Sequence, residues 1–334
     1  MRRRIIKQGH STLTVTLPNK WVKKNNLKPK DEIDLFERGN NLLITVEKQN
    51  FDLVTELDIS ELDIPVIWKY FMAIYREGYH EIKVKFNPNQ FFGSPYKFFT
   101  SYAFDLKYRR KPQSLTPFET IQIIANRFIG FEVIEHRKDY CIIREMSEIS
   151  GKEFDSALRR VFLLILQMGE IMLEAIKTNN LDLLKPTNDM DINVDKFHDY
   201  CVRILNKKGL EKKPHLMFTS LFILELVGDE FKNVARHLLE EFKNKRLNNL
   251  KPVAELIIQQ LNAFYSLFYS FNKEKVIEMS KRDYDVHFYL PKLYYKESKK
   301  EIKLSEIELE IFNHFRRMSK LINALTELRL EMEF

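Results

Sequence analysis

The hydrophobic period of the chain changes along its length, and this change limits the folds open to it. Near the start, Ser11–Leu17 alternates strictly between polar and apolar residues, the pattern of a strand with one buried face. From residue 152 to residue 334, apolar residues recur every three or four positions, as in amphipathic helices packed into a bundle. Because 334 residues also exceed one core of ordinary size, we expect a multidomain α+β protein.

The first 48 residues predict a small strand-rich unit. In the alternating strand, Leu13, Val15 and Leu17 share one face, and a short helix is expected over Asn19–Asn26 after Pro18. A hairpin then follows across residues 38–41. The expected order is strand, strand, short helix, strand, strand. So small a unit with open strand edges is expected to pair with a second copy of itself.

The positive charge of the chain is concentrated at its start. Residues 1–30 contain nine basic residues and no acidic one, so the net charge of +7 leaves about −2 for the rest. The nine are Arg2, Arg3, Arg4, Lys7, Lys20, Lys23, Lys24, Lys28 and Lys30. Such an asymmetry favours a polyanionic partner, because each neutralised phosphate releases counterions. A basic face that only aids solubility is the alternative.

The same segment resembles a known family. The runs Lys7–Val22, Leu27–Ile33 and Leu42–Ile44 are similar to the AbrB/MazE/SpoVT swapped-hairpin family over nearly all of residues 1–48, although Lys30 stands where that family usually has Gly. The resemblance implies that two chains interlace into one β-barrel that binds DNA. The residues expected to contact DNA are Arg2, Arg3, Arg4, Lys7, His10, Ser11, Lys20, Lys23 and Lys24. A dimerisation module without DNA binding is the alternative.

Residues 52–148 predict a small α+β connector. Its expected elements are helices over Leu62–Glu77 and Pro117–Phe128 and strands over Glu81–Phe86, Phe131–His136 and Tyr140–Arg144. An insertion over residues 87–114 is rich in aromatic residues and ends in a basic run. The pattern assigns no structure to this insertion.

Two pairs of carboxylates mark the helical half, which spans residues 152–334. Asp195 with Asp199, and Glu225 with Asp229, each lie one helical turn apart on one face. Facing pairs of this kind could chelate a hard metal ion through oxygen ligands. An ordinary solvated helix face explains the same spacing.

The helical half resembles PhoU proteins. The run Leu224–Ala235 is similar to the PhoU helix that carries a Glu, a small residue and an Asp, and the resemblance implies two three-helix repeats. It also implies a divalent or iron ion at the four carboxylates of the first repeat. In the second repeat, Arg316 and Lys320 occupy the positions of Glu225 and Asp229, so the charge is reversed there. The helices expected for the second repeat are Lys251–Phe271, a short Glu274–Arg282, and Ser305–Glu331.

The connector supplies the third part of the resemblance. Ala73–Val84 and Ile129–Ile134 are similar to the linking region of archaeal proteins that fuse an AbrB domain to a PhoU domain, the phosphate uptake regulators. The resemblance implies a cytoplasmic transcription regulator of phosphate uptake whose helical half senses a signal or docks a transport or signalling protein. The alternative is a PhoU-like interaction protein that acts on a phosphate transporter and uses residues 1–48 only to dimerise.

Several function classes lack their motifs. The sequence has no Walker A loop, no GxGxxG after a strand, no GxSxG and no HExxH, so we expect no enzymatic activity. The two cysteines, Cys141 and Cys201, lack the spacing of a zinc site or redox pair, which fits a reducing cytoplasm. No apolar run reaches the length of a bilayer span, so no membrane insertion is expected.

Overall fold

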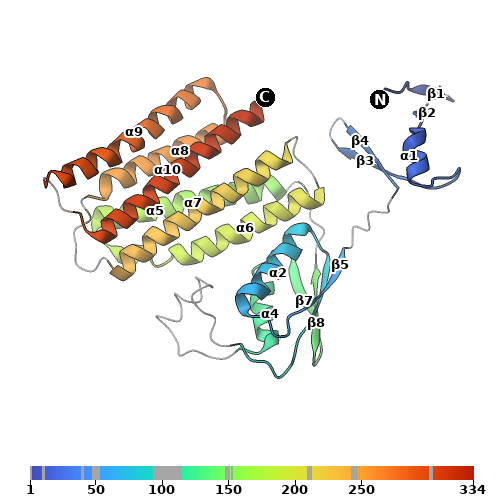
Figure 1. Cartoon of the computed structure of the whole chain (residues 1–334), viewed down its shortest axis with the longest axis horizontal. Helices are drawn as coiled ribbons and strands as arrows, with labels where there is room; N and C mark the ends of the chain where they lie inside the picture. Colours follow the sequence, from blue (N-terminus) through green and yellow to red (C-terminus); the bar gives the residue numbers. More distant parts are fainter. Residues whose placement is uncertain are drawn as a thin grey trace. The chain divides into compact units, whose positions relative to one another are not determined.

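The computed structural model divides into two compact units, residues 1–51 and residues 52–334 (Figure 1). The structure describes residues 2–9, 12–38, 41–46, 53–92, 115–146, 151, 153–208, 213–241, 247, 249–300 and 304–334. His10 and Ser11, and most of the 87–114 insertion, lie outside these ranges.

The first unit has the predicted order of elements. Strands β1 (Ile6–Gln8) and β2 (Thr12–Thr14) pair antiparallel, and helix α1 (Asn19–Lys24) follows. Strands β3 (Asp34–Arg38) and β4 (Asn41–Thr45) form the second hairpin. The alternating segment Ser11–Leu17 is therefore strand over a shorter stretch than its pattern predicts.

The turn before β3 has the geometry that a glycine would suit. Lys30 has a φ of +84°, in the left-handed region where a Cβ atom is strained. The turn is held by two hydrogen bonds, from Lys28 N to Asp31 Oδ2 (2.6 Å) and from Asp31 N to the Lys28 carbonyl (3.1 Å). The departure from the family pattern at Lys30 thus leaves the backbone shape in place and adds strain to it.

The described side chains of the first unit form no buried core within one chain. Among its residues whose burial the structure describes, none is buried. Leu13 is 66% exposed, Val15 46% and Leu35 57%, although the alternation predicts an inward face for the first two. Each exposed apolar side chain forgoes about 1.5 to 3 kcal/mol of burial free energy. A second surface must cover these residues if the unit is to be stable.

The second unit begins with a four-stranded sheet in the order β5-β6-β8-β7. Its strands are β5 (Val54–Asp58), β6 (Glu81–Lys85), β7 (Phe131–His136) and β8 (Tyr140–Glu145). The β5 and β6 strands pair in parallel, whereas β6 with β8 and β8 with β7 pair antiparallel. The β5 strand was not predicted, and it makes the start of the connector a β-α-β unit.

Two capped helices accompany this sheet. Helix α2 (Ile64–Glu77) begins after Asp63, whose side chain accepts a hydrogen bond from Val66 N, and ends at Gly78 with a φ of +94°. Helix α4 (Pro117–Ala125) begins with a capping box between Thr116 and Glu119. Both helices confirm the sequence prediction to within a few residues.

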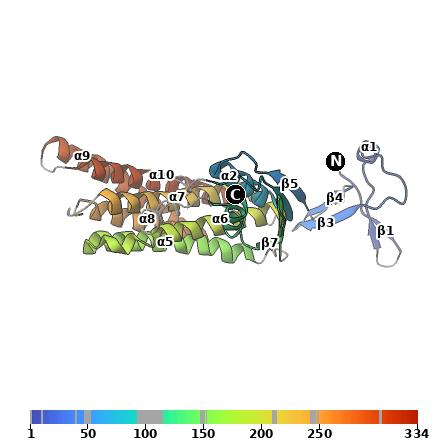
Figure 2. The same cartoon turned by 90° about the horizontal axis from the view of Figure 1, so that it is seen from below.

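Beyond the sheet, the described residues form six long α-helices in two sets of three (Figure 2). The first set is α5 (Glu153–Thr178), α6 (Thr187–Lys208) and α7 (Pro214–Glu241), and the second is α8 (Lys251–Tyr269), α9 (Lys273–Ser298) and α10 (Glu306–Glu333). A 3₁₀ turn, Leu181–Leu184, connects α5 with α6. The helices of each set contact one another, and α7 packs on α10 and α5 on α8 between the sets. No helix of the described part is long and apolar enough to cross a membrane.

The predicted short helix Glu274–Arg282 is wrong in length. Helix α9 continues through Pro291 to Ser298, where the sequence predicts a break. Proline removes one backbone hydrogen bond and costs about 3 kcal/mol within a helix. Val286, Leu290 and Leu293 are buried on the same helix, and their burial offsets that cost.

The sheet is joined to the bundle by Arg203 of α6, whose side chain is completely buried. Its guanidinium donates to the carbonyls of Tyr75 (2.6 Å) and Tyr79 (2.8 Å), at the end of α2. It also lies 3.0 Å from Glu145 Oε2 at the end of β8, and over the ring of Phe131. One side chain of the bundle therefore binds a helix end, a strand end and an aromatic ring of the α+β part.

Glu145 completes this buried contact. Its Oε2 also accepts from Lys207 Nζ at 2.6 Å. Burial alone would raise the pKa of Glu145, but the hydrogen bond from Lys207 and the charge of Arg203 outweigh it and hold this pKa below its ordinary value. The carboxylate is thus ionised and doubly paired at neutral pH.

Removing the guanidinium should destabilise the second unit strongly. We expect Arg203→Met to lower the free energy of unfolding by about 3 to 5 kcal/mol, because Glu145 is left as a buried charge with one partner fewer. Urea unfolding followed by Trp68 fluorescence, in a Trp21→Phe background, isolates this unit because the chain has two tryptophans. The exposed Arg236→Met is the matched control and should change stability by about 0.5 kcal/mol or less. Equal effects of the two substitutions would contradict the role of Arg203.

Candidate nucleic-acid interface and sites of the helical bundle

The basic residues before Asp31 are all accessible. Those that the sequence predicts as DNA contacts and that the structure describes are exposed: Arg2, Arg3, Arg4, Lys7, Lys20, Lys23 and Lys24. Lys7 of β1 pairs in register with Leu13 of β2, so their side chains share one face of the hairpin, and the three lysines of residues 20–24 extend from α1. Trp21 and Val22 on the same helix are half-buried, which fixes the outward direction of those lysines. The unit therefore presents a frame of cations with no acidic residue before Asp31.

In the helical half, the predicted carboxylates lie where the bundle meets the α+β part. Asp199 of α6 pairs with Arg76 of α2, whose Nε donates to Asp199 Oδ1 at 2.7 Å. One turn earlier, Asp195 lies 3.3 Å from the guanidinium of Arg127, just beyond α4. Arg76 also lies 5.0 Å from the ring centroid of Phe222, and this cation–π contact holds it at the interface. Both carboxylates of α6 thus have cationic partners in the same chain.

The second predicted pair lies on the adjacent helix α7. Lys232 Nζ donates to Asp229 and, at 2.7 Å, to Oδ2 of Asp191 on α6. Glu225 is near enough to raise the pKa of Asp195 through its charge. The structure therefore brings all four predicted residues to one region of α6 and α7. A metal ion there stays a prediction, and the cations Arg76, Arg127 and Lys232 already supply positive charge to it.

Crowding has a clear effect on these acids. Burial, and next the charge of Asp229, raise the pKa of Glu225 to about 7. Burial and the neighbouring carboxylates Asp191 and Glu225 raise the pKa of Asp195 well above its ordinary value. The cluster is thus held together by its cations against its own repulsion.

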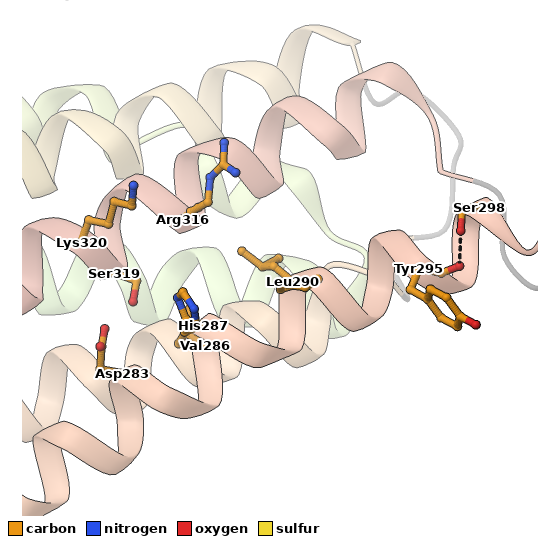
Figure 3. A pocket seen from close by; sticks show the side chains of 10 residues that line it. Asp283, Val286, His287, Leu290, Tyr295, Ser298, Arg316, Ser319 and Lys320 are labelled. Atoms are coloured by element: carbon orange, nitrogen blue, oxygen red, sulfur yellow. Dashed lines mark hydrogen bonds between the residues drawn. The ribbon is translucent and has the colours of Figure 1, made fainter.

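A separate cavity of about 640 Å³ lies between α9 and α10 (Figure 3). Figure 3 shows Asp283, His287 and Leu290 of α9 turned towards α10, from which Ser319 points back. The remaining lining residues are Val286, Pro291, Tyr295, Ser298, Arg316 and Lys320. Arg316 and Lys320 are the residues whose charge is reversed relative to the first three-helix set. The lining combines apolar side chains with an acidic residue, Asp283, and two basic ones, which suits a small ligand with an apolar body and polar groups.

Comparison with known proteins bears on the first unit. Residues 6–52 match the family model of MazE, described as "Antidote-toxin recognition MazE, bacterial antitoxin". This segment is a MazE/AbrB-type domain. The match covers the elements β1 to β4 and ends where the second unit begins. No curated protein and no solved structure matched the chain.

The MazE-type domain was predicted from its motif, whereas one group of possible ligands in the bundle was not. His237 of α7 and Glu310 and His314 of α10 bring three ligand atoms within 4.8 Å of one another. The spacing of Glu310 and His314, one helical turn, was visible in the sequence. Their partner His237 is remote from them in the sequence, so only the packing of α7 on α10 reveals the group.

Substitution of Glu225 should make the stability less dependent on pH. A carboxyl whose pKa rises from 4.5 to about 7 on folding keeps its proton in the folded chain and loses it in the unfolded one, so stability falls as pH rises between these values. In buffer with a chelator, Glu225→Gln should therefore gain on the order of 2 kcal/mol over the wild type between pH 4.5 and pH 8. The same fluorescence-detected unfolding measures it. The exposed Glu170→Gln, as control, should show no such trend. A pH-independent difference for Glu225→Gln would refute the raised pKa.

Proposed function

We propose that the chain is a non-enzymatic, homodimeric DNA-binding transcription regulator. The observation that carries this proposal is the MazE/AbrB-type match over residues 6–52, on a segment whose described basic residues are all exposed. Cations on a rigid frame bind the phosphate backbone by releasing its counterions. Dimerisation doubles the charge that faces the DNA and gives the two-fold symmetry of a palindromic site.

The exposed apolar residues of the domain support the dimer. Leu13, Val15 and Leu35 lack a covering surface within one chain. A second copy supplies apolar residues of the same kind in the same number, which is the economical way to build the missing core. The dimer is therefore part of the proposed fold of the domain as well as of its function.

For residues 52–334 we propose a sensing or partner-docking role in phosphate uptake. This part of the proposal is supported by the resemblance to PhoU and by two sets of three helices in the bundle. The alternative is an interaction protein that acts on a phosphate transporter and uses the MazE-type domain only to dimerise.

DNA binding should depend steeply on salt. We expect the full-length protein to bind genomic DNA fragments with a logarithmic salt slope of about −0.9 per phosphate contacted. The triple variant Arg3→Gln, Arg4→Gln, Lys7→Gln should bind more weakly and with a flatter slope, because the phosphate contacts are lost. Anisotropy titrations between about 50 and 300 mM salt would measure both quantities.

A matched triple variant controls for net charge. Lys251→Gln, Lys281→Gln and Lys292→Gln remove the same charge from exposed positions of the bundle and should leave the slope unchanged. Absence of binding at the lowest salt would favour the alternative in which the domain only dimerises. Equal slopes in the two triple variants would refute contact through residues 3–7.

A charge on the apolar face of β2 should dissociate the dimer. We expect Leu13→Glu to convert the full-length protein to monomers in sedimentation equilibrium, because the carboxylate would be buried between two chains. Thr12→Glu, on the opposite side of the same strand, should leave the dimer intact. A wild-type monomer at micromolar concentration, or dimers of equal strength in both variants, would contradict pairing through this face.

A further inference from the structure

A group of potential metal ligands lies between the two three-helix sets, on α7 and α10. Glu310 and His314 are one turn apart on α10, and His237 faces them from α7. One ligand atom of each residue lies within 4.8 Å of the other two, and the rings of His237 and His314 are 5.2 Å apart between centroids. The three side chains thus converge on one point.

The imidazole of His314 is held in position by a carboxylate. Its Nδ1 contacts Oε2 of Glu230 on α7, while the residue is only 4% exposed. Its other nitrogen, Nε2, is buried and has no hydrogen-bond partner, and it lies 3.9 Å from Oε1 of Glu310. A buried ring nitrogen without a partner costs about 1 to 3 kcal/mol. A carboxylate on one ring nitrogen is also the usual support for a histidine whose other nitrogen binds a metal.

The charge around the group suits a cation. Glu230 and Glu310 are both acidic, and Arg317 lies 3.7 Å from the first and 3.6 Å from the second. If both imidazoles are neutral, the two carboxylates and the one guanidinium sum to a net charge of −1 beside His237 and His314. A divalent cation would change this net charge from −1 to +1, and it would give Nε2 of His314 the partner that it lacks.

We propose that His237, Glu310 and His314 bind a divalent transition-metal ion of the zinc class. Two imidazoles and one carboxylate are a ligand set that zinc accepts, with a fourth position open to water. Ideal tetrahedral ligands at bond lengths of about 2.0 to 2.2 Å lie roughly 3.4 Å apart, so a contraction of about 1 Å closes the site. Glu310 is exposed and rotates readily to make that movement. The bound ion links α7 of the first set to α10 of the second, whether or not the chain binds DNA.

Zinc titration of the chelator-stripped full-length protein tests the site. We expect one equivalent of Zn²⁺ per chain against a competing chromophoric chelator, and a Co²⁺ spectrum with the absorption of a four-coordinate ion. His237→Ala and Glu310→Gln, which change more accessible residues than His314, should each weaken Zn²⁺ binding at least 10-fold, the minimum seen for loss of an outer-shell partner. His215→Ala, an exposed histidine of α7, is the matched control and should bind Zn²⁺ as the wild type does.

The same titration tests whether Zn²⁺ binds instead to the carboxylates of α6 and α7. The double variant Glu225→Ala, Asp229→Ala should retain the full equivalent of Zn²⁺. Loss of binding in that double variant, together with unchanged binding in His237→Ala and Glu310→Gln, would overturn the proposal and locate the ion between α6 and α7. Failure of the wild type to bind one equivalent would overturn it as well.

Discussion

The second unit depends on the burial of one charged side chain. Moving a guanidinium out of water costs several kcal/mol, and Arg203 recovers this cost only because two carbonyls of the α2 end and the Glu145 carboxylate surround it. These partners come from distant parts of the chain and meet only when the sheet docks on α6. The α+β segment and the bundle therefore pack into one compact unit.

On α6 and α7, pairs of acidic residues one helical turn apart fit two different kinds of partner, a metal ion or the side chains of arginine and lysine. Acidic residues one turn apart are what a metal site needs, and equally what an interface with arginines needs. Arg76 and Arg127 are remote in sequence from Asp199 and Asp195, so spacing alone could not show that they pair. An ion that entered this cluster would compete with these arginines, and with Lys232, for the same oxygens. Metal binding there and docking of the α+β part would then be thermodynamically coupled.

The sequence predicted those elements whose sequence signals are local. The order of elements in the MazE-type domain, helix α2 and the helices of the first set follow from hydrophobic period and turns. Strand β5 was missed because it is defined by its parallel pairing with β6, and the two strands are separated in the sequence by helix α2. The length of α9 was underestimated because the burial of Leu290 and Leu293 outweighs a proline that local rules treat as a stop. The group of His237, Glu310 and His314 could not be predicted, because it forms only when α7 packs on α10 and no local sequence pattern shows that contact.

The exposure of the described apolar side chains in the first unit has a consequence for control in the cell. If folding of this segment requires a second chain, then its folded fraction is set by the number of chains per volume, as for any obligate dimer. At low abundance most copies would carry an unfolded, protease-sensitive N-terminus, and a modest rise in synthesis would recruit them together. The segment would then act as a threshold device for gene dosage, in addition to whatever signal the bundle receives.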